Sequence, residues 1–148
     1  MTAMGAEETF AWIEDEAAAR AAFPVMRQLR PHLADADEFV ARWQRQRAAG
    51  YRLLALWRGA RPVALAGMRL QENLIHGLFL YVDDLVTDEA LRGSGLGEKL
   101  MGRVKEEAKA QGCAKLVLDT GLDNVLGHRF YYRQGLLAAA LRFSQRLP

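Results

Sequence analysis

Apolar and polar positions along the N-terminal part of the chain predict one strand and two helices. Residues 8–15 predict a short first strand. Residues 14–30 are alanine-rich and favour a helix, which Pro24 is expected to end or to kink. Residues 35–50 carry their large apolar side chains on one side of a second predicted helix.

The middle of the chain predicts a group of strands. Residues 51–58 and 63–71 are two mostly apolar runs, and the turn between them is marked by Gly59 and Pro62. Residues 77–87 form a third run that stays apolar until it reaches two aspartates. The sequence therefore predicts a strand, a turn and two further strands here.

The C-terminal half alternates helices with strands. Apolar residues recur at helical spacing between residues 95 and 111, and residues 114–120 follow as a short apolar strand. Residues 123–134 predict another helix, and residues 136–147 predict a last strand. The full order is βααβββαβαβ, which predicts an α/β (α+β) fold whose mixed sheet carries helices on both faces.

Composition and charge exclude several classes of protein. The 148 residues, 51% hydrophobic and 26% charged, predict a single domain over residues 1–148. A net charge of +2 argues against a nucleic-acid partner, which would usually require a clustered basic face. Cys113 is the only cysteine, so an intrachain disulfide is impossible and no metal site is expected. Without an apolar run of membrane-spanning length or a signal peptide, we expect a cytoplasmic protein that binds no membrane.

Three glycines stand at alternate positions where the helix from residue 95 begins. The segment LRGSGLGEKL contains Gly93, Gly95 and Gly97. The first N–H groups of a helix lack internal partners and carry a partial positive charge, and glycines let an anion approach them closely. Arg92 and the hydroxyl of Ser94 can add donors. The segment favours a phosphate or pyrophosphate ligand, although such turns also often just connect a strand to a helix.

Two common phosphate-binding motifs are missing from this segment. A P-loop, GxxxxGK[ST], does not occur in the sequence. The dinucleotide motif GxGxxG fails at Glu98 or at Leu100, depending on the glycine from which it is counted. The chain is also too short for a dinucleotide-binding domain followed by a substrate domain.

The segment RGSGLG resembles the R/Q-x-x-G-x-G/A motif of the GNAT superfamily of acyl-CoA-dependent N-acetyltransferases. The match runs through Arg92, Gly95 and Gly97, between a strand and a helix as in that family. Further on, NVLGHRFYYRQGL resembles the second motif of the family through Asn124, Phe130, Tyr131 and Gly135. The resemblance covers residues from about 51 to 140. It implies a GNAT-like fold, with a mixed, mostly antiparallel twisted sheet flanked by helices.

The resemblance also implies a binding site for acetyl-CoA as a co-substrate. The pyrophosphate would lie on the backbone N–H groups of seven consecutive residues: Arg92, Gly93, Ser94, Gly95, Leu96, Gly97 and Glu98. The backbone of Leu85, Val86 and Thr87 would pair with the pantetheine arm, and the amide of Val86 would polarise the thioester carbonyl. Asn124 would contact the cofactor from the late helix, and Tyr131 would sit beside the thioester sulfur.

The chain departs from the family pattern in two places. Leu136 replaces the usual aromatic residue after Gly135, which changes packing modestly. One C-terminal strand is expected, where many members have two. This difference shortens one wall of the acceptor site or leaves that wall to be completed by a partner subunit. A homodimer is therefore one expected assembly.

Asp83 and Asp84 are the candidate acids of the strand predicted over residues 77–87. Adjacent strand residues point to opposite faces, so we expect only one of them to face the acceptor. Asp83 aligns with the general base of many family members, often a glutamate that acts through water, and Asp84 would then be structural. His76, His128 and bulk water stay open as bases, and both acids could instead be surface carboxylates at a strand end.

Tyr131 is the candidate acid for the departing thiolate. A tyrosine stays protonated at neutral pH, and Tyr131 lies seven residues after Asn124, so both can face the cofactor from one side of the helix. We therefore predict an N-acetyltransferase that moves an acetyl group from acetyl-CoA to a primary amine of a small molecule or peptide, by direct attack in a ternary complex. The alternative is a non-catalytic acyl-CoA-binding sensor or regulatory module, but the pairing of Tyr131 with Asp83 favours the enzyme.

Overall fold

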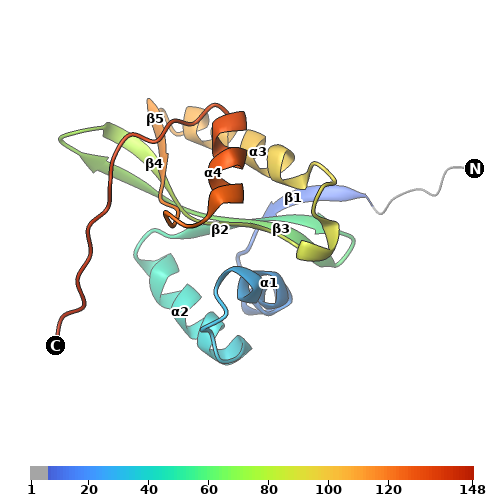
Figure 1. The fold of residues 1–148 in the computed structure, drawn as a ribbon. Coiled ribbons are helices and arrows are strands. Elements are labelled where there is room, and N and C mark those ends of the chain that lie inside the picture. The colour runs from blue at the N-terminus through green and yellow to red at the C-terminus, as the bar shows by residue number, and fades with distance from the viewer. Residues whose placement is uncertain (1–6) are drawn as a thin grey trace, which may run out of the picture. The chain divides into compact units, whose positions relative to one another are not determined.

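The structure is a computed structural model, and it describes residues 7–148. The chain divides by its internal contacts into two compact units, one reaching to Val117 and the other running from Leu118 to Pro148. The single domain expected over residues 1–148 stays a prediction. The elements in chain order are β1 (Glu8–Trp12), α1 (Glu16–Leu29), α2 (Ala36–Ala48), β2 (Arg52–Arg58), β3 (Arg61–Asn73), β4 (Gly77–Thr87), the 3-10 turn η1 (Glu89–Leu91), α3 (Leu96–Ala110), β5 (Lys115–Leu118) and α4 (Val125–Arg133) (Figure 1).

The sheet follows the chain order β1-β2-β3-β4-β5. The pairs β1–β2, β2–β3 and β3–β4 are all antiparallel, and each pair joins two strands that follow one another in the sequence. The predicted mixed, mostly antiparallel sheet with helices on both faces is therefore confirmed.

The first helix begins and ends for identifiable local reasons. Asp15 caps α1, because its carboxylate accepts a hydrogen bond of 2.8 Å from the N–H of Ala18. β1 ends at Trp12, three residues earlier than the sequence predicts. Pro24 lies inside α1 and does not end it. The packing of the helix's apolar side outweighs the hydrogen bond that a proline loses.

Helices cover both faces of the sheet in the first unit. Figure 1 shows α1 and α2 on one face and α3 on the other. On the α1 and α2 face, Phe23, Phe39 and Trp43 pack on strand residues of the same cluster, such as Leu53 and Leu65. The α3 helix is buried through Leu96, Leu100, Met101, Val104 and Ala108. The predicted helix over residues 95–111 is thus confirmed with bounds of Leu96–Ala110.

The predicted last strand is wrong. Residues 136–148 form no helix or strand in the structure, and Leu137 and Phe143 are exposed. A strand forms only where a neighbouring strand donates and accepts main-chain hydrogen bonds. Among the described residues this segment has no such neighbour, so its strand-like composition does not produce a strand. An ion pair between Arg142 and Asp119 connects the segment to the residue after β5.

Candidate active site

The predicted phosphate site forms the N-terminus of α3. Gly95 is the N-cap residue, with φ 83° and ψ 6°, and Gly93 has φ 82°. Both values lie in the left-handed region that glycine adopts without strain. Among residues 7–148, no heavy atom beyond the glycine and its two chain neighbours lies within 4 Å of the position that a Cβ would take at either glycine. The backbone of this loop is therefore open for close approach by a ligand.

The first N–H groups of α3 are uncapped. No side chain in the described part of the chain accepts a hydrogen bond at the cap, and the first helical bond runs from the N–H of Lys99 to the carbonyl of Gly95. The N–H groups of Leu96, Gly97 and Glu98 thus precede the internal ladder, where the helix dipole is positive. An anion fits this position better than any neutral group.

The glycine loop, residues 92–95, has two polar side chains, and only one of them is free to contact a ligand. Arg92 is exposed directly before Gly93. The hydroxyl of Ser94 instead donates a hydrogen bond to the carbonyl of Leu91. Ser94 therefore contributes to the fold of the loop with its side chain, and its backbone N–H remains the group predicted to bind.

The segment between β4 and the glycine loop is anchored to α1. The buried carboxylate of Asp88 accepts hydrogen bonds from the N–H of Ala90 at 3.1 Å and from Gln28 at 3.2 Å, and it forms an ion pair with Arg61. The amide oxygen of Gln28 also accepts from the N–H of Glu89 at 2.9 Å. Burial opposes ionisation of Asp88, but these hydrogen bonds prevail and lower its pKa. Sequence reasoning missed this anchor.

A β-bulge interrupts β4 at its two aspartates. Met68 is opposite Val82 and Gly67 is opposite Asp84, so Asp83 is an extra residue without a partner on β3. The bulge breaks the alternation of side chains along the strand. As a result, both carboxylates contact groups on the α1 side of the sheet, and the prediction that they point to opposite faces is wrong.

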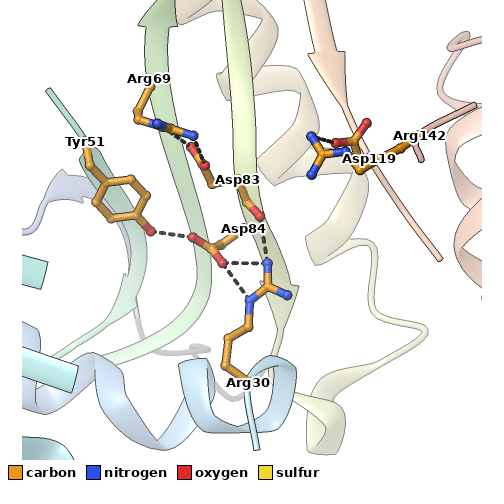
Figure 2. A network of polar contacts seen from close by, with 7 residues as sticks. All are labelled: Arg30, Tyr51, Arg69, Asp83, Asp84, Asp119 and Arg142. Atoms are coloured by element: carbon orange, nitrogen blue, oxygen red, sulfur yellow. Dashed lines mark hydrogen bonds and ion pairs between the residues drawn. The ribbon is translucent and has the colours of Figure 1, made fainter. Parts of the chain in front are cut away.

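Each of the two acids has its own partners (Figure 2). Asp83 accepts two hydrogen bonds from Arg69, at 3.0 Å from Nε and 2.7 Å from Nη2. Asp84 accepts 2.9 Å and 2.8 Å contacts from Arg30 through one oxygen and a 2.7 Å hydrogen bond from Tyr51 through the other. Asp84 therefore has the structural surroundings expected of it, whereas the role of Asp83 as a base stays a prediction.

Tyr51 reaches Asp84 across a glycine. Its side chain is buried, and a Cβ at Gly67 would lie 1.8 Å from the Tyr51 hydroxyl. Burial and the charge of Asp84 raise the pKa of Tyr51 well above its ordinary value. A glycine inside an otherwise apolar strand pattern signals such a close approach, so Gly67 was the sequence feature that could have revealed this contact.

Asn124, His128 and Tyr131 belong to the second unit. Asn124 caps α4, since its carbonyl accepts from the N–H of Gly127 at 3.1 Å while its amide donates to Thr120 at 2.9 Å. Nε2 of His128 lies 2.8 Å from the carbonyl of Gly121, so this nitrogen carries the proton and Nδ1 keeps the lone pair in the neutral ring. Tyr131 is half-buried, and burial raises its pKa.

The predicted site residues between Asp83 and Glu98 form one continuous segment of the first unit. Asp83 lies in the bulge, Leu85, Val86 and Thr87 complete β4, and the glycine loop follows after η1. Asn124 and Tyr131 lie in the other unit, at the start and near the end of α4. His76 is half-buried in the β3–β4 turn, where Nδ1 lies 3.1 Å from Nζ of Lys115.

Residues 7–148 contain neither a cluster of metal ligands nor a membrane-spanning helix. No group of three or more histidine, cysteine, aspartate or glutamate side chains within this range is placed to hold a metal ion. None of the helices in the range combines the length and the apolar character needed to cross a membrane.

Comparison with known proteins identifies the family. The model of the acetyltransferase (GNAT) family matches residues 9–136. The uncharacterized N-acetyltransferase YhdJ of Bacillus subtilis is 30% identical over 74% of this chain and 77% of its own length. The aminoalkylphosphonate N-acetyltransferase of Salmonella typhimurium is 30% identical over 61% of this chain and 59% of its own. The crystal structure of the aminoglycoside N-acetyltransferase AAC(6')-Iy with CoA superimposes with a TM-score of 0.84 at 13% identity, covering 99% of each chain.

The chain belongs to the GNAT acetyltransferase family. It is an acetyl-CoA-dependent N-acetyltransferase that acts on an amine acceptor. Membership therefore resolves the choice between an enzyme and a non-catalytic acyl-CoA-binding module in favour of the enzyme.

Proposed function

We propose that the chain transfers the acetyl group directly from acetyl-CoA to a primary amine of a small molecule or peptide, in a ternary complex. The observation that carries this proposal is the open start of α3. Two left-handed glycines and uncapped N–H groups follow a strand that contains a bulge and two acids. Such a backbone nest suits a pyrophosphate, because its donors are already fixed in place.

The backbone of the first unit would hold the donor. In this proposal the N–H groups from Arg92 to Glu98 bind the pyrophosphate, and Leu85, Val86 and Thr87 pair with the pantetheine arm. Acetyl-CoA supplies the activated acetyl thioester. The N–H of Val86 would stabilise the negative charge that develops on the carbonyl oxygen during attack.

Asp83 would remove the proton that the amine must lose before or during attack. Both of its carboxylate oxygens lie close to Arg69. A water molecule between the amine and the carboxylate is therefore the favoured proton path, since it requires no displacement of the guanidinium. Asp83 is also short for a base, which makes the same water relay more necessary.

Tyr131 would donate a proton to the departing sulfur. The pKa of its phenol, raised by burial, keeps the group protonated throughout the neutral range. Asn124 is proposed to contact the cofactor from the start of the same helix. Because its side chain already caps α4, this contact would use the second lone pair of its carbonyl or the second N–H of its amide.

Acceptors with an anionic group are the first to test. The relative from Salmonella typhimurium is named for aminoalkylphosphonates. In this chain Arg30 and Arg69 flank the two acids, and each side chain is 41% exposed. Their outer N–H groups can contact a phosphonate while their inner N–H groups stay hydrogen-bonded to the two carboxylates.

Thiol release from acetyl-CoA, measured against a panel of amines, tests the proposal. The panel contains an aminoalkylphosphonate, an aminoglycoside, a polyamine, amino acids and peptides with free N-termini. With the best acceptor, intersecting initial-velocity lines are expected, because both substrates must be bound before transfer. Parallel lines, or a burst of CoA without acceptor, would instead indicate a covalent acetyl-enzyme and contradict direct attack.

A further inference from the structure

An arginine donates a hydrogen bond to the main-chain carbonyl of the extra residue in the β4 bulge. Asp83 is the extra residue of the bulge, so its carbonyl lies outside the register with β3. Nη2 of Arg30 donates to this oxygen at 2.8 Å and also contacts the carboxylate of Asp84 at 2.8 Å. A part-buried carbonyl left without a hydrogen bond would oppose the bulge, and the bond from Arg30 removes that penalty.

Tyr51 contacts the same stretch of β4 through the other carboxylate oxygen of Asp84. Its hydroxyl donates to the second oxygen of Asp84 at 2.7 Å, and its ring occupies the space beside Gly67. Gly67 is the residue opposite Asp84 on β3. A side chain at position 67 would exclude the phenol, so the sequence provides a specific place for this contact.

Both contacts depend on the bulged register. In an antiparallel pair, a shift by one residue turns each side chain to the opposite face of the sheet. Without the extra residue at position 83, Asp84 would leave the face on which Arg30 and Tyr51 lie. The two contacts therefore stabilise the bulge over a regular ladder, and they fix the residues that follow it.

We infer that Arg30 and Tyr51 are positioning residues that clamp the β4 bulge and thereby set the place of Asp83 and of the backbone of residues 85–87. The inference rests on the proposed function, in which that backbone pairs with the pantetheine arm. In this role neither side chain needs to touch acetyl-CoA. Arg30 is the C-cap residue of α1 and Tyr51 precedes β2, so the clamp connects α1 and β2 to the strand that holds the donor.

The test compares two clamp variants with a matched control. Tyr51→Phe removes one hydroxyl and keeps the ring beside Gly67, and Arg30→Gln removes the guanidinium. Arg42→Gln is the control, because Arg42 is a similarly exposed arginine that pairs with Glu38 on its own helix. Circular dichroism first establishes which variants fold, and Tyr51→Phe is the milder change if Arg30→Gln does not.

Hydrogen exchange on the ligand-free chain is the first readout. The amides of residues 84–87 should exchange on the order of 10-fold faster in both clamp variants, while those of α3 stay as in the unmodified chain. The control should change neither set. Unchanged exchange at residues 84–87 in a folded clamp variant would overturn the inference, and this result does not depend on any ligand.

Calorimetry with two ligands is the second readout. ADP carries the pyrophosphate without the pantetheine arm, whereas CoA carries both. The affinity for CoA should fall on the order of 10-fold in the clamp variants while the affinity for ADP stays constant. Equal losses for the two ligands, or none, would contradict a role in positioning β4. If the unmodified chain binds neither ligand, the proposed donor site fails and the exchange result alone decides the clamp.

Discussion

At the scale of single residues, Tyr131 and Tyr132 form a natural pair for experiment. They are adjacent on α4, but Tyr131 is half-buried with a raised pKa and Tyr132 is 55% exposed. Tyr131→Phe should leave the affinity for CoA nearly unchanged and lower kcat on the order of 10²-fold, because it removes the proposed proton donor. Steady-state kinetics on both phenylalanine variants measure the difference.

Tyr132→Phe is the control for this substitution and should turn over like the unmodified enzyme. If both variants retain normal turnover, Tyr131 is a packing residue. Its ring already makes an edge-to-face contact with the ring of Phe130, with the ring centroids 5.5 Å apart.

A second residue-scale prediction concerns Asp83. Asp83→Asn should lower kcat/KM on the order of 10²-fold at neutral pH, because an amide does not accept the proton from the amine. The loss should shrink toward alkaline pH, where the free amine is already abundant. Asp84→Asn should act mainly through stability and donor binding, since Asp84 contacts Arg30 and Tyr51. The pH–rate profiles of the two variants provide the measurement.

An unchanged pH–rate profile in Asp83→Asn would place the base elsewhere. His128 would then be the first alternative, because Nδ1 of its neutral ring keeps a lone pair while Nε2 contacts Gly121.

At the scale of elements, α3 offers a matched pair of glycines at its two ends. Gly95 precedes its first turn with φ 83°, Gly112 follows its last turn with φ 77°, and both face open space. Gly95→Glu and Gly112→Glu should each cost about 1–2 kcal/mol of stability, because a side chain strains a left-handed backbone. Gly95→Glu alone should abolish CoA binding, since it adds bulk and negative charge where the pyrophosphate is proposed.

Calorimetric titration with CoA and thermal unfolding of both variants check this prediction. Normal CoA affinity in a folded Gly95→Glu protein would reject the site at the start of α3. Equal loss of affinity in both variants would show that the effect arises from general destabilisation.

At the scale of the whole molecule, carboxylates far apart in the sequence support the first unit. Hydrogen bonds from Lys99 and Arg58 lower the pKa of Glu8. In Asp88 and in Glu107, burial opposes the shift but hydrogen bonds outweigh it, so both pKa values are lowered. A carboxylate whose pKa is lowered by folding contributes stability above its ordinary pKa, and the contribution is lost as pH falls through the folded value.

The free energy of unfolding should therefore be similar at pH 7 and pH 5 and should fall below about pH 4. Denaturant titrations at several pH values measure it. Asp88→Asn should cost about 1–3 kcal/mol at neutral pH and weaken the acid dependence. Glu14→Gln, at an exposed position before α1, is the control and should change neither. Stability that is unchanged down to pH 3 would contradict the role of these carboxylates.

Local sequence signals accounted for most of the elements and for the glycine loop before α3. Helix periodicity located α3, and the glycines at residues 93 and 95 indicated a backbone open to close approach, which the structure contains. These features depend on neighbours within a few residues, so they can be recognised without the rest of the chain. The motif at Arg92, Gly95 and Gly97 likewise pointed to the family that comparison identified.

The tertiary structure decided how distant segments pair and where the acids face. The register of β3 with β4 creates the bulge at Asp83, and this bulge brings both aspartates to one face. The contacts of Asp84 with Arg30 and Tyr51 join positions 54 and 33 residues apart. Residues 136–147 have a strand-like sequence but no strand, because a strand requires a partner that sequence pattern does not supply. Periodicity and caps are local properties, whereas register, facing and strand pairing arise only when remote parts of the chain meet.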